Sequence, residues 1–245
     1  MNNRQQVSAW TALGFGGLKR VPMLAILSVL CVLSLPAEAA SESPPVSPGS
    51  VVTLEVSPEA RLISALEKTK TFYARFEQTQ VSPSGRQTRM AGQLWVKRPG
   101  QLLWKIEKPY SQTHLIEGQT FVLFDPDLAQ VTKRSLTKAF AATPAGLLLG
   151  AEDQIAKTLG DQFVITGQSP REDLAWVRLV PRQPDQALAH IDIGLDASGV
   201  VKAFDSVDGL ARVLRIRFSQ VRLNQAIPAS QFQLVIPAGT EVISQ

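Results

Sequence analysis

The hydrophobic positions of the chain change their spacing near residue 70, from a helical period to a strand period. Leu62, Ile63 and Leu66 gather on one side of a segment that starts near Pro58, which predicts a short amphipathic helix. From Phe72 onward, apolar residues alternate with polar ones in short runs between turn residues, as in antiparallel strands. The predicted strands are 72–80, 90–96, 101–106, 114–117, 121–124, 129–132, 162–167, 175–180, 188–195, 200–206, 213–221 and 231–236.

The segment 134–160 interrupts this series with helical spacing. Residues 140–150 carry no charge, and a threonine followed by Pro144 is a helix-start signal. A second apolar stripe, 155–159, is predicted to end at Gly160. A sheet of this many strands tends to curl or close. We therefore expect a mainly β fold with helices, an incomplete and curved antiparallel barrel whose mouth this helical insertion could cover.

Several predicted strands are apolar on both faces, which a plain antiparallel meander is not. Leu102 and Trp104 share one face of their strand, and Leu103 lies on the other. We expect the helices to cover one apolar face and the interior of the barrel to hold the other. Ordinary core packing and an apolar ligand cavity both fit this pattern. The candidate cavity residues are Phe76, Leu94, Val96, Leu102, Trp104, Phe121, Phe140, Leu147 and Leu148.

Arg98 is the charged residue that we single out. It lies at a strand end in the run Lys-Arg-Pro-Gly, close in sequence to Trp95 and Trp104. A guanidinium there can donate several hydrogen bonds to the carbonyls of a covering segment. The alternative is an ordinary solvated turn residue.

The first 39 residues have the pattern of a secretory signal. Basic residues precede an apolar stretch, 23–35, which the small-residue pattern Ala37-Glu38-Ala39 follows. The stretch is shorter than the roughly 20 residues that span a membrane, so a retained anchor is the weaker alternative. We predict cleavage after Ala39, a Ser/Pro-rich flexible tether over 40–57, and one domain over 58–245.

Cys31 is the one cysteine of the chain and lies within the predicted leader. A lipidated bacterial cysteine needs a small residue before it, and Leu30 is large. The exported protein would therefore contain no cysteine and no disulfide.

Composition excludes several classes of protein. The 44% hydrophobic content of the 245 residues is too high for a disordered chain. The 25 basic and 21 acidic residues give a charge of +4, which is too small to indicate nucleic-acid binding. Removing the leader takes away three basic residues and one acidic residue, leaving 22 against 20, or +2.

The motifs of catalysis and of metal or cofactor binding are missing from the sequence. His114 and His190 lie far apart, and no nucleophile-elbow pattern surrounds a serine. The sequence has no glycine-rich phosphate loop, and the run 125–127 (Asp-Pro-Asp) fits a turn better than a metal site. We therefore expect a protein that is not an enzyme and uses no metal or cofactor.

Two neighbouring runs resemble a known family. Residues 72–80 contain the pattern Phe-x-Ala-Arg-Phe-x-Gln, and 92–104 read Gly-Gln-Leu-Trp-Val-Lys-Arg-Pro-Gly-Gln-Leu-Leu-Trp. Together with 124–131 and 176–181, they are similar to the periplasmic outer-membrane lipoprotein carrier protein (LolA) family. The resemblance extends from about Pro58 to the C-terminus and implies a half-barrel closed by a helical lid.

The resemblance also implies a function. Members of this family take acylated lipoproteins from an inner-membrane LolCDE-type ABC transporter, shield the acyl chains, and pass them to a LolB-type outer-membrane receptor. By position, Arg98 corresponds to the family's arginine that bonds to the lid and holds it shut. Where the family often has an aromatic residue four positions later, this chain has Leu102.

The expected protein is thus a periplasmic, monomeric chaperone that binds no nucleic acid. Two alternatives stay open: a soluble lipid or lipoprotein sensor with the same half-barrel, and a lipid esterase.

Overall fold

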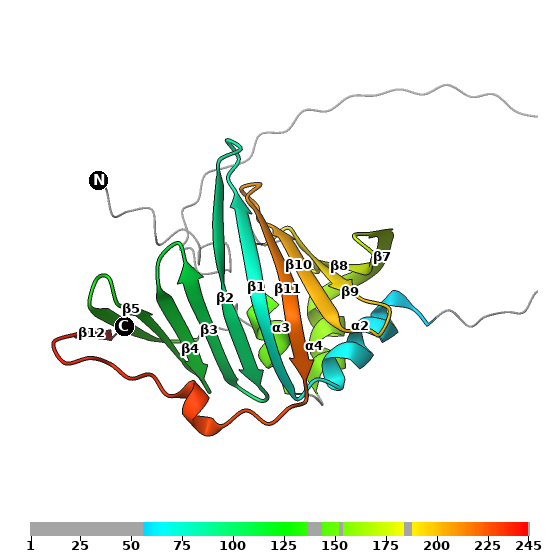
Figure 1. The fold of residues 1–245 in the computed structure, drawn as a ribbon. Coiled ribbons are helices and arrows are strands. Elements are labelled where there is room, and N and C mark those ends of the chain that lie inside the picture. Colours follow the sequence, from blue (N-terminus) through cyan, green and yellow to red (C-terminus); the bar gives the residue numbers. More distant parts are fainter. Residues whose placement is uncertain (1–55, 137–143, 152–153, 184–187, 245) are drawn as a thin grey trace, which may run out of the picture. The chain divides into compact units, whose positions relative to one another are not determined.

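The computed structural model describes residues 56–136, 144–151, 154–183 and 188–244 (Figure 1). The predicted leader with Cys31, and the candidate cavity residue Phe140, lie outside these residues. The helices are α2 (Pro58–Glu67), α3 (Pro144–Leu149), α4 (Ile155–Gln162) and the 3-10 helix η3 (Ala229–Phe232). The strands are β1 (Thr71–Val81), β2 (Gln87–Lys97), β3 (Gln101–Lys108), β4 (Gln112–Glu117), β5 (Thr120–Asp125), β6 (Gln130–Ser135), β7 (Phe163–Arg171), β8 (Leu174–Pro181), β9 (His190–Leu195), β10 (Val201–Val207), β11 (Val213–Leu223) and β12 (Glu241–Ser244).

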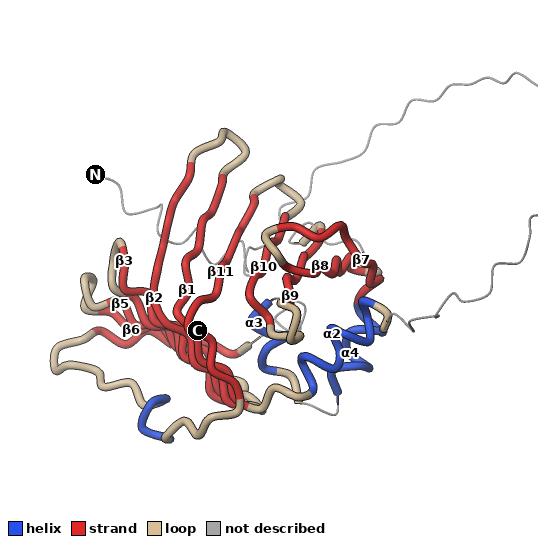
Figure 2. Tube along the Cα trace, turned by 45° about the vertical axis from the view of Figure 1, so that its right-hand side comes forward, coloured by secondary structure: helices blue, strands red, loops and turns tan. Residues whose placement is uncertain are grey.

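These strands form a single sheet in the order β12-β6-β5-β4-β3-β2-β1-β11-β10-β9-β8-β7. Strands β1 to β11 pair antiparallel, and β12 pairs parallel to β6. The sheet bends around the helices and stays open between its two edge strands (Figure 2). The predicted mainly β fold, an open and curved antiparallel sheet with few helices, is confirmed.

Helix α2 lies against the β7–β8 end of the sheet because its sequence supplies a cap and one apolar face. The Ser57 hydroxyl accepts a hydrogen bond from the Ala60 amide at 3.1 Å, and Pro58 occupies the first turn. Leu62 and Leu66 are buried on the side facing the sheet. Gly167 in β7 allows this approach, since a Cβ there would lie 2.8 Å from a Pro58 side-chain carbon.

The main hydrophobic cluster fills the concave side of the sheet, beneath the helices. Leu62, Leu147 and Leu159 represent the three helices in it, and β1 together with the strands on both sides of it supplies the other residues. Because these apolar residues alternate with outward-facing ones along each strand, a single face of the sheet is buried by the helices. The concave face is therefore a covered apolar surface.

The second apolar face lies on the convex side, and its covering differs from our expectation. Leu103 and Leu115 pack there against Phe232, which follows β11 by nine residues. We expected the barrel interior to hold the second apolar face and predicted a strand over 231–236. Both predictions are wrong. Helix η3 and the extended chain after it cross the outside of the sheet, where the Phe232 side chain packs against Leu103 and Leu115.

Helix α4 also differs from its predicted end at Gly160. The helix continues to Gln162, and a Cβ at Gly160 would meet nothing within 4 Å. Gly160 is thus an interior helix residue and not a terminating one.

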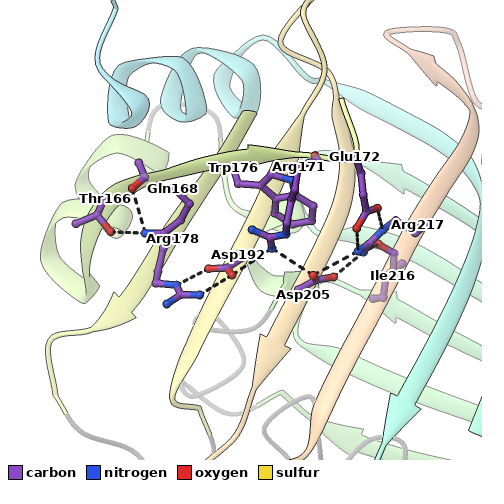
Figure 3. Close-up of polar contacts among 11 residues, drawn as sticks. Thr166, Gln168, Arg171, Glu172, Trp176, Arg178, Asp192, Asp205, Ile216 and Arg217 are labelled. Carbon is purple, nitrogen blue, oxygen red and sulfur yellow. Dashed lines mark hydrogen bonds and ion pairs between the residues drawn. The ribbon is translucent and has the colours of Figure 1, made fainter. Parts of the chain in front are cut away.

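A charged network on the convex face ties the β7–β8 turn to three strands (Figure 3). The Arg171 guanidinium stacks over Trp176, 3.6 Å from the ring centroid, and contacts Asp192 and Asp205 at 3.3 Å. Glu172 in the same turn accepts hydrogen bonds from Arg217 of β11. The network holds the turn down over the outside of the sheet.

Replacing Asp192 by alanine should destabilise this end of the sheet by about 2 kcal/mol. Asp192 is 5% exposed and accepts hydrogen bonds from Arg178 at 2.7 and 2.8 Å. Burial raises its pKa, but the Arg178 hydrogen bonds and nearby positive charges outweigh this effect and set the pKa below its usual value. Urea unfolding monitored by circular dichroism measures the loss.

The matched control is Asp161→Ala, which removes an exposed ion pair with Lys157. That change should cost less than about 0.5 kcal/mol, since solvent screens such pairs. Equal losses for the two variants would contradict a structural role for the buried network.

Candidate functional site

Arg98 joins two helices to the sheet from the turn between β2 and β3. Its side chain is buried, with 8% of the residue exposed. Its guanidinium donates to the Leu148 carbonyl at 2.6 Å, the Leu147 carbonyl at 3.0 Å and the Leu66 carbonyl at 2.5 Å. One side chain thereby connects β2, α3 and α2.

These acceptors are carbonyls at helix C-termini, which explains why an arginine fits here. The last turn of a helix leaves carbonyls without intrahelical donors and carries partial negative charge. Leu147 and Leu148 belong to the last turn of α3, and Leu66 to that of α2. The planar guanidinium offers several donors in a fixed fork, so it can serve both helix ends at once.

The backbone of the same turn adds to this attachment. The Gly100 amide donates to the Leu149 carbonyl at 3.3 Å, and the Arg98 amide donates to the Lys70 carbonyl at 2.9 Å. Gly100 has φ +78°, a left-handed conformation that glycine adopts without strain. The turn that carries Arg98 is therefore shaped to reach the end of α3.

Helix α3 lies over the concave face as an apolar plug, and we call it the lid helix. Leu147, Leu148 and Leu149 are all less than 10% exposed and belong to the concave cluster. The helix is only six residues long, so it depends on these contacts and on Arg98 more than on its own hydrogen bonds.

The structure brings the described candidate cavity residues together in the concave cluster, to which the lid helix itself contributes. Phe76 and Trp104 contact each other within the concave cluster, with ring centroids 4.4 Å apart. The described candidates are all buried in this one cluster: Phe76, Leu94, Val96, Leu102, Trp104, Phe121, Leu147 and Leu148. Phe140 lies outside the described residues, and whether these side chains line an acyl-chain cavity stays a prediction.

His114 is a buried polar residue to which the sequence pattern assigns no role. It is fully buried on β4, edge-on to the Phe121 ring, and its Nε2 lies 3.5 Å from the Gln112 Oε1. Burial, followed by the charge of Arg134, lowers the pKa of His114 to about 3. The imidazole is therefore neutral at physiological pH.

This pKa predicts a loss of stability in acid. In the unfolded state His114 becomes protonated below about pH 6.5, whereas in the folded state it stays neutral down to about pH 3. Between pH 7 and pH 5 this residue should lower the free energy of unfolding by about 2 kcal/mol. Urea unfolding at the two pH values measures it, and His114→Gln should remove most of that difference.

The control for this prediction is His190→Gln. Burial lowers the pKa of His190 as well, but this residue is less buried, so the variant should keep most of the acid sensitivity. An unchanged difference in His114→Gln would contradict the assignment.

Sequence reasoning found Arg98 and the apolar face but missed part of the site. Nothing in the spacing of Leu66 indicated that its carbonyl would share the Arg98 guanidinium with the lid helix. The one signal in the sequence was the start of a short helix near Pro58. A short helix that begins there has Leu66 close to its C-terminal end.

The described residues contain no group of three or more histidine, cysteine, aspartate or glutamate side chains placed to hold a metal ion. Within the same residues, no helix has the length and apolar character needed to cross a membrane.

The fold and site define a half-barrel protein whose apolar concave face lies under a short helix held by an arginine. Comparison with known proteins shows the family to which the chain belongs. The family model for outer membrane lipoprotein carrier protein LolA matches residues 67–235. The chain therefore belongs to the LolA family of outer-membrane lipoprotein carrier proteins.

Individual relatives match over most of their length. An outer-membrane lipoprotein carrier protein of Bordetella bronchiseptica is 34% identical over 202 residues, which are 79% of this chain and 92% of the relative. One from Dechloromonas aromatica is 33% identical over 181 residues, 74% of this chain and 84% of the relative. The crystal structure of a LolA superfamily protein from Nitrosomonas europaea aligns with a TM-score of 0.41 at 15% identity, covering 73% of this chain and 98% of that one.

Proposed function

We propose that this protein is a periplasmic chaperone that shields the acyl chains of lipoproteins between its concave face and the lid helix. It receives them from an inner-membrane LolCDE-type ABC transporter and delivers them to a LolB-type outer-membrane receptor. Arg98 serves as the latch of the lid helix. The observation that carries this proposal is the attachment of an uncharged lid helix, over a largely apolar face, by hydrogen bonds from one arginine.

The energetics of acyl chains explain why a lid of this kind is useful. Each buried methylene contributes about 0.8 kcal/mol, so several long chains fully buried in a fixed cavity would not be released. In the closed state the lid helix and the cluster residues bury one another. Cargo must displace these contacts and the Arg98 hydrogen bonds, which offsets part of its binding energy. The carrier can then hold acyl chains and still give them up.

Export supports the same proposal. The predicted signal over 1–39 would deliver the protein across the inner membrane, where its cargo and receptor are found. Mass determination of the mature N-terminus tests this, with cleavage after Ala39 as the expected result.

The direct test is purification of the protein from the periplasm of cells that make a triacylated lipoprotein. We expect the lipoprotein to co-purify with its acyl chains intact, and mass spectrometry to identify both. A form of the lipoprotein that lacks its acyl chains serves as the control and should not co-purify. Absence of the acylated form would contradict the carrier function, and release of free fatty acid would favour the esterase.

A further inference from the structure

The C-terminal strap, residues 224–240, covers an apolar patch on the convex face. The patch consists of one side chain from each of four neighbouring strands: Trp95, Leu103, Leu115 and Val122. The strap places Ile227, Phe232 and Leu234 on it, and Phe232 is 3% exposed. This surface lies on the opposite side of the sheet from the lid helix, so it plays no part in the concave site.

The strap is held firmly at its two ends. At its start, Asn224 accepts from the Lys70 amide at 2.7 Å and donates to the Lys68 carbonyl at 2.8 Å. At its finish, the Glu241 amide donates to the Ala129 carbonyl at 2.8 Å, and β12 pairs with β6. These ends fix where the strap runs whether or not its middle touches the sheet.

The middle of the strap is attached differently. Its backbone hydrogen bonds run within the strap itself, from Gln231 to Pro228, Gln233 to Ser230 and Thr240 to Pro237. Burial of the Ile227, Phe232 and Leu234 side chains therefore holds the middle of the strap on the sheet. The segment can lift without breaking the ladders of β1 to β11.

The chemistry of the strap shows what the patch accepts. Residues 224–240 contain no charged side chain, and prolines at 228 and 237 favour extended chain on both sides of the single 3-10 turn. The patch itself has an aromatic side chain and three aliphatic ones. It thus fits an extended, uncharged segment that inserts one aromatic ring.

We propose that this convex patch is a docking surface for an extended, uncharged segment of a partner protein with an aromatic side chain, and that the strap is its built-in competitor. The partner's aromatic ring takes the place of Phe232 while the two ends of the strap stay attached. Docking is then regulated by the equilibrium between the seated and the lifted strap. The inference does not rest on the nature of the cargo.

The probe for this surface is a fluorescent peptide that copies residues 226–236. Phe232→Ala should weaken the seating of the strap, so the full-length variant should bind the peptide at least tenfold more tightly than the unmodified protein. The measurement is fluorescence anisotropy. Val235→Ala is the matched control, because Val235 is 84% exposed on the same strap and its loss should leave peptide affinity unchanged.

Specificity is tested with a second peptide in which the phenylalanine is alanine, and it should not bind. Equal affinity of the first peptide for the unmodified and Phe232→Ala proteins, or no binding to the variant, would overturn the proposal. So would elution of the variant as a dimer in size-exclusion chromatography, since a second copy would then occupy the patch.

Hydrogen exchange of the unmodified protein covers the case in which Phe232→Ala does not fold. Amides in 229–236 should exchange at least a hundredfold faster than those in the centre of β3, because the strap opens while the sheet stays folded. Exchange of the strap at the same rate as β3 would show that it leaves only on unfolding, and would overturn the proposal.

Discussion

Replacing Arg98 with leucine is expected to leave lipoprotein uptake intact but to slow its transfer to the receptor by tenfold or more. The variant loses the guanidinium donors to Leu147, Leu148 and Leu66, while leucine retains apolar contact in the same place. Hydrogen bonds from a charged donor contribute about 1.5–3 kcal/mol each. Without these hydrogen bonds the closed state competes less well with the open, loaded form. Closure of the lid helix then no longer drives release of the lipoprotein.

The measurement is transfer of a purified triacylated lipoprotein from the loaded protein to the receptor over time. Arg98→Lys should be intermediate, because an ammonium cannot span the carbonyls of two helices as the planar guanidinium does. Arg61→Leu removes an exposed arginine of α2 and should transfer at the normal rate. Normal transfer by Arg98→Leu would refute the latch.

The same variant has a structural signature that does not depend on cargo. Amide exchange in α3 should accelerate, while exchange in β1 and β11 stays unchanged, because a six-residue helix has little stability of its own. Unchanged protection of α3 would show that the apolar contacts hold the lid helix without Arg98.

The sequence predicted the parts of the fold that local spacing controls. Alternation placed Leu102 and Trp104 on one face and Leu103 on the other, and the structure confirms this division. Side chains on a strand must alternate, so the face of a residue follows from its neighbours once the strand is recognised. The start of α2 followed in the same way from its cap and proline.

What the sequence did not predict depends on contacts between distant segments. The run around Phe232 alternates like a strand, yet it crosses the convex face because Leu103 and Leu115, more than a hundred residues earlier, offer it an apolar surface. Likewise, β12 pairs parallel to β6, a partner that periodicity does not specify. The convex network of Arg171 and Asp192 was missed because each residue taken alone is an ordinary surface charge.

Gly92 illustrates how a motif residue can have a structural role that spacing alone does not reveal. It lies at an irregularity in the β2–β3 ladder, where the register shifts between Ala91 and Gly92. A Cβ at this position would lie 1.9 Å from the Lys105 carbonyl oxygen, 2.9 Å from its carbonyl carbon and 3.0 Å from the Ile106 Cα. All three atoms belong to the backbone of β3, so no side-chain rotation can relieve the overlap.

Gly92→Ala should therefore force β2 and β3 apart and cost more than about 4 kcal/mol, a large part of the 5–15 kcal/mol that stabilises a typical domain. The hairpin that would separate carries Arg98 in its turn and Leu94 and Trp104 in the concave cluster, so the lid helix should be lost with it. Urea unfolding and the yield of folded protein measure the effect. Gly160→Ala is the matched control: a Cβ there meets nothing within 4 Å, and alanine should stabilise α4 by about 0.5–1 kcal/mol. If both variants unfolded at the same urea concentration, the close approach of β2 and β3 at Gly92 could not be what holds this hairpin in place.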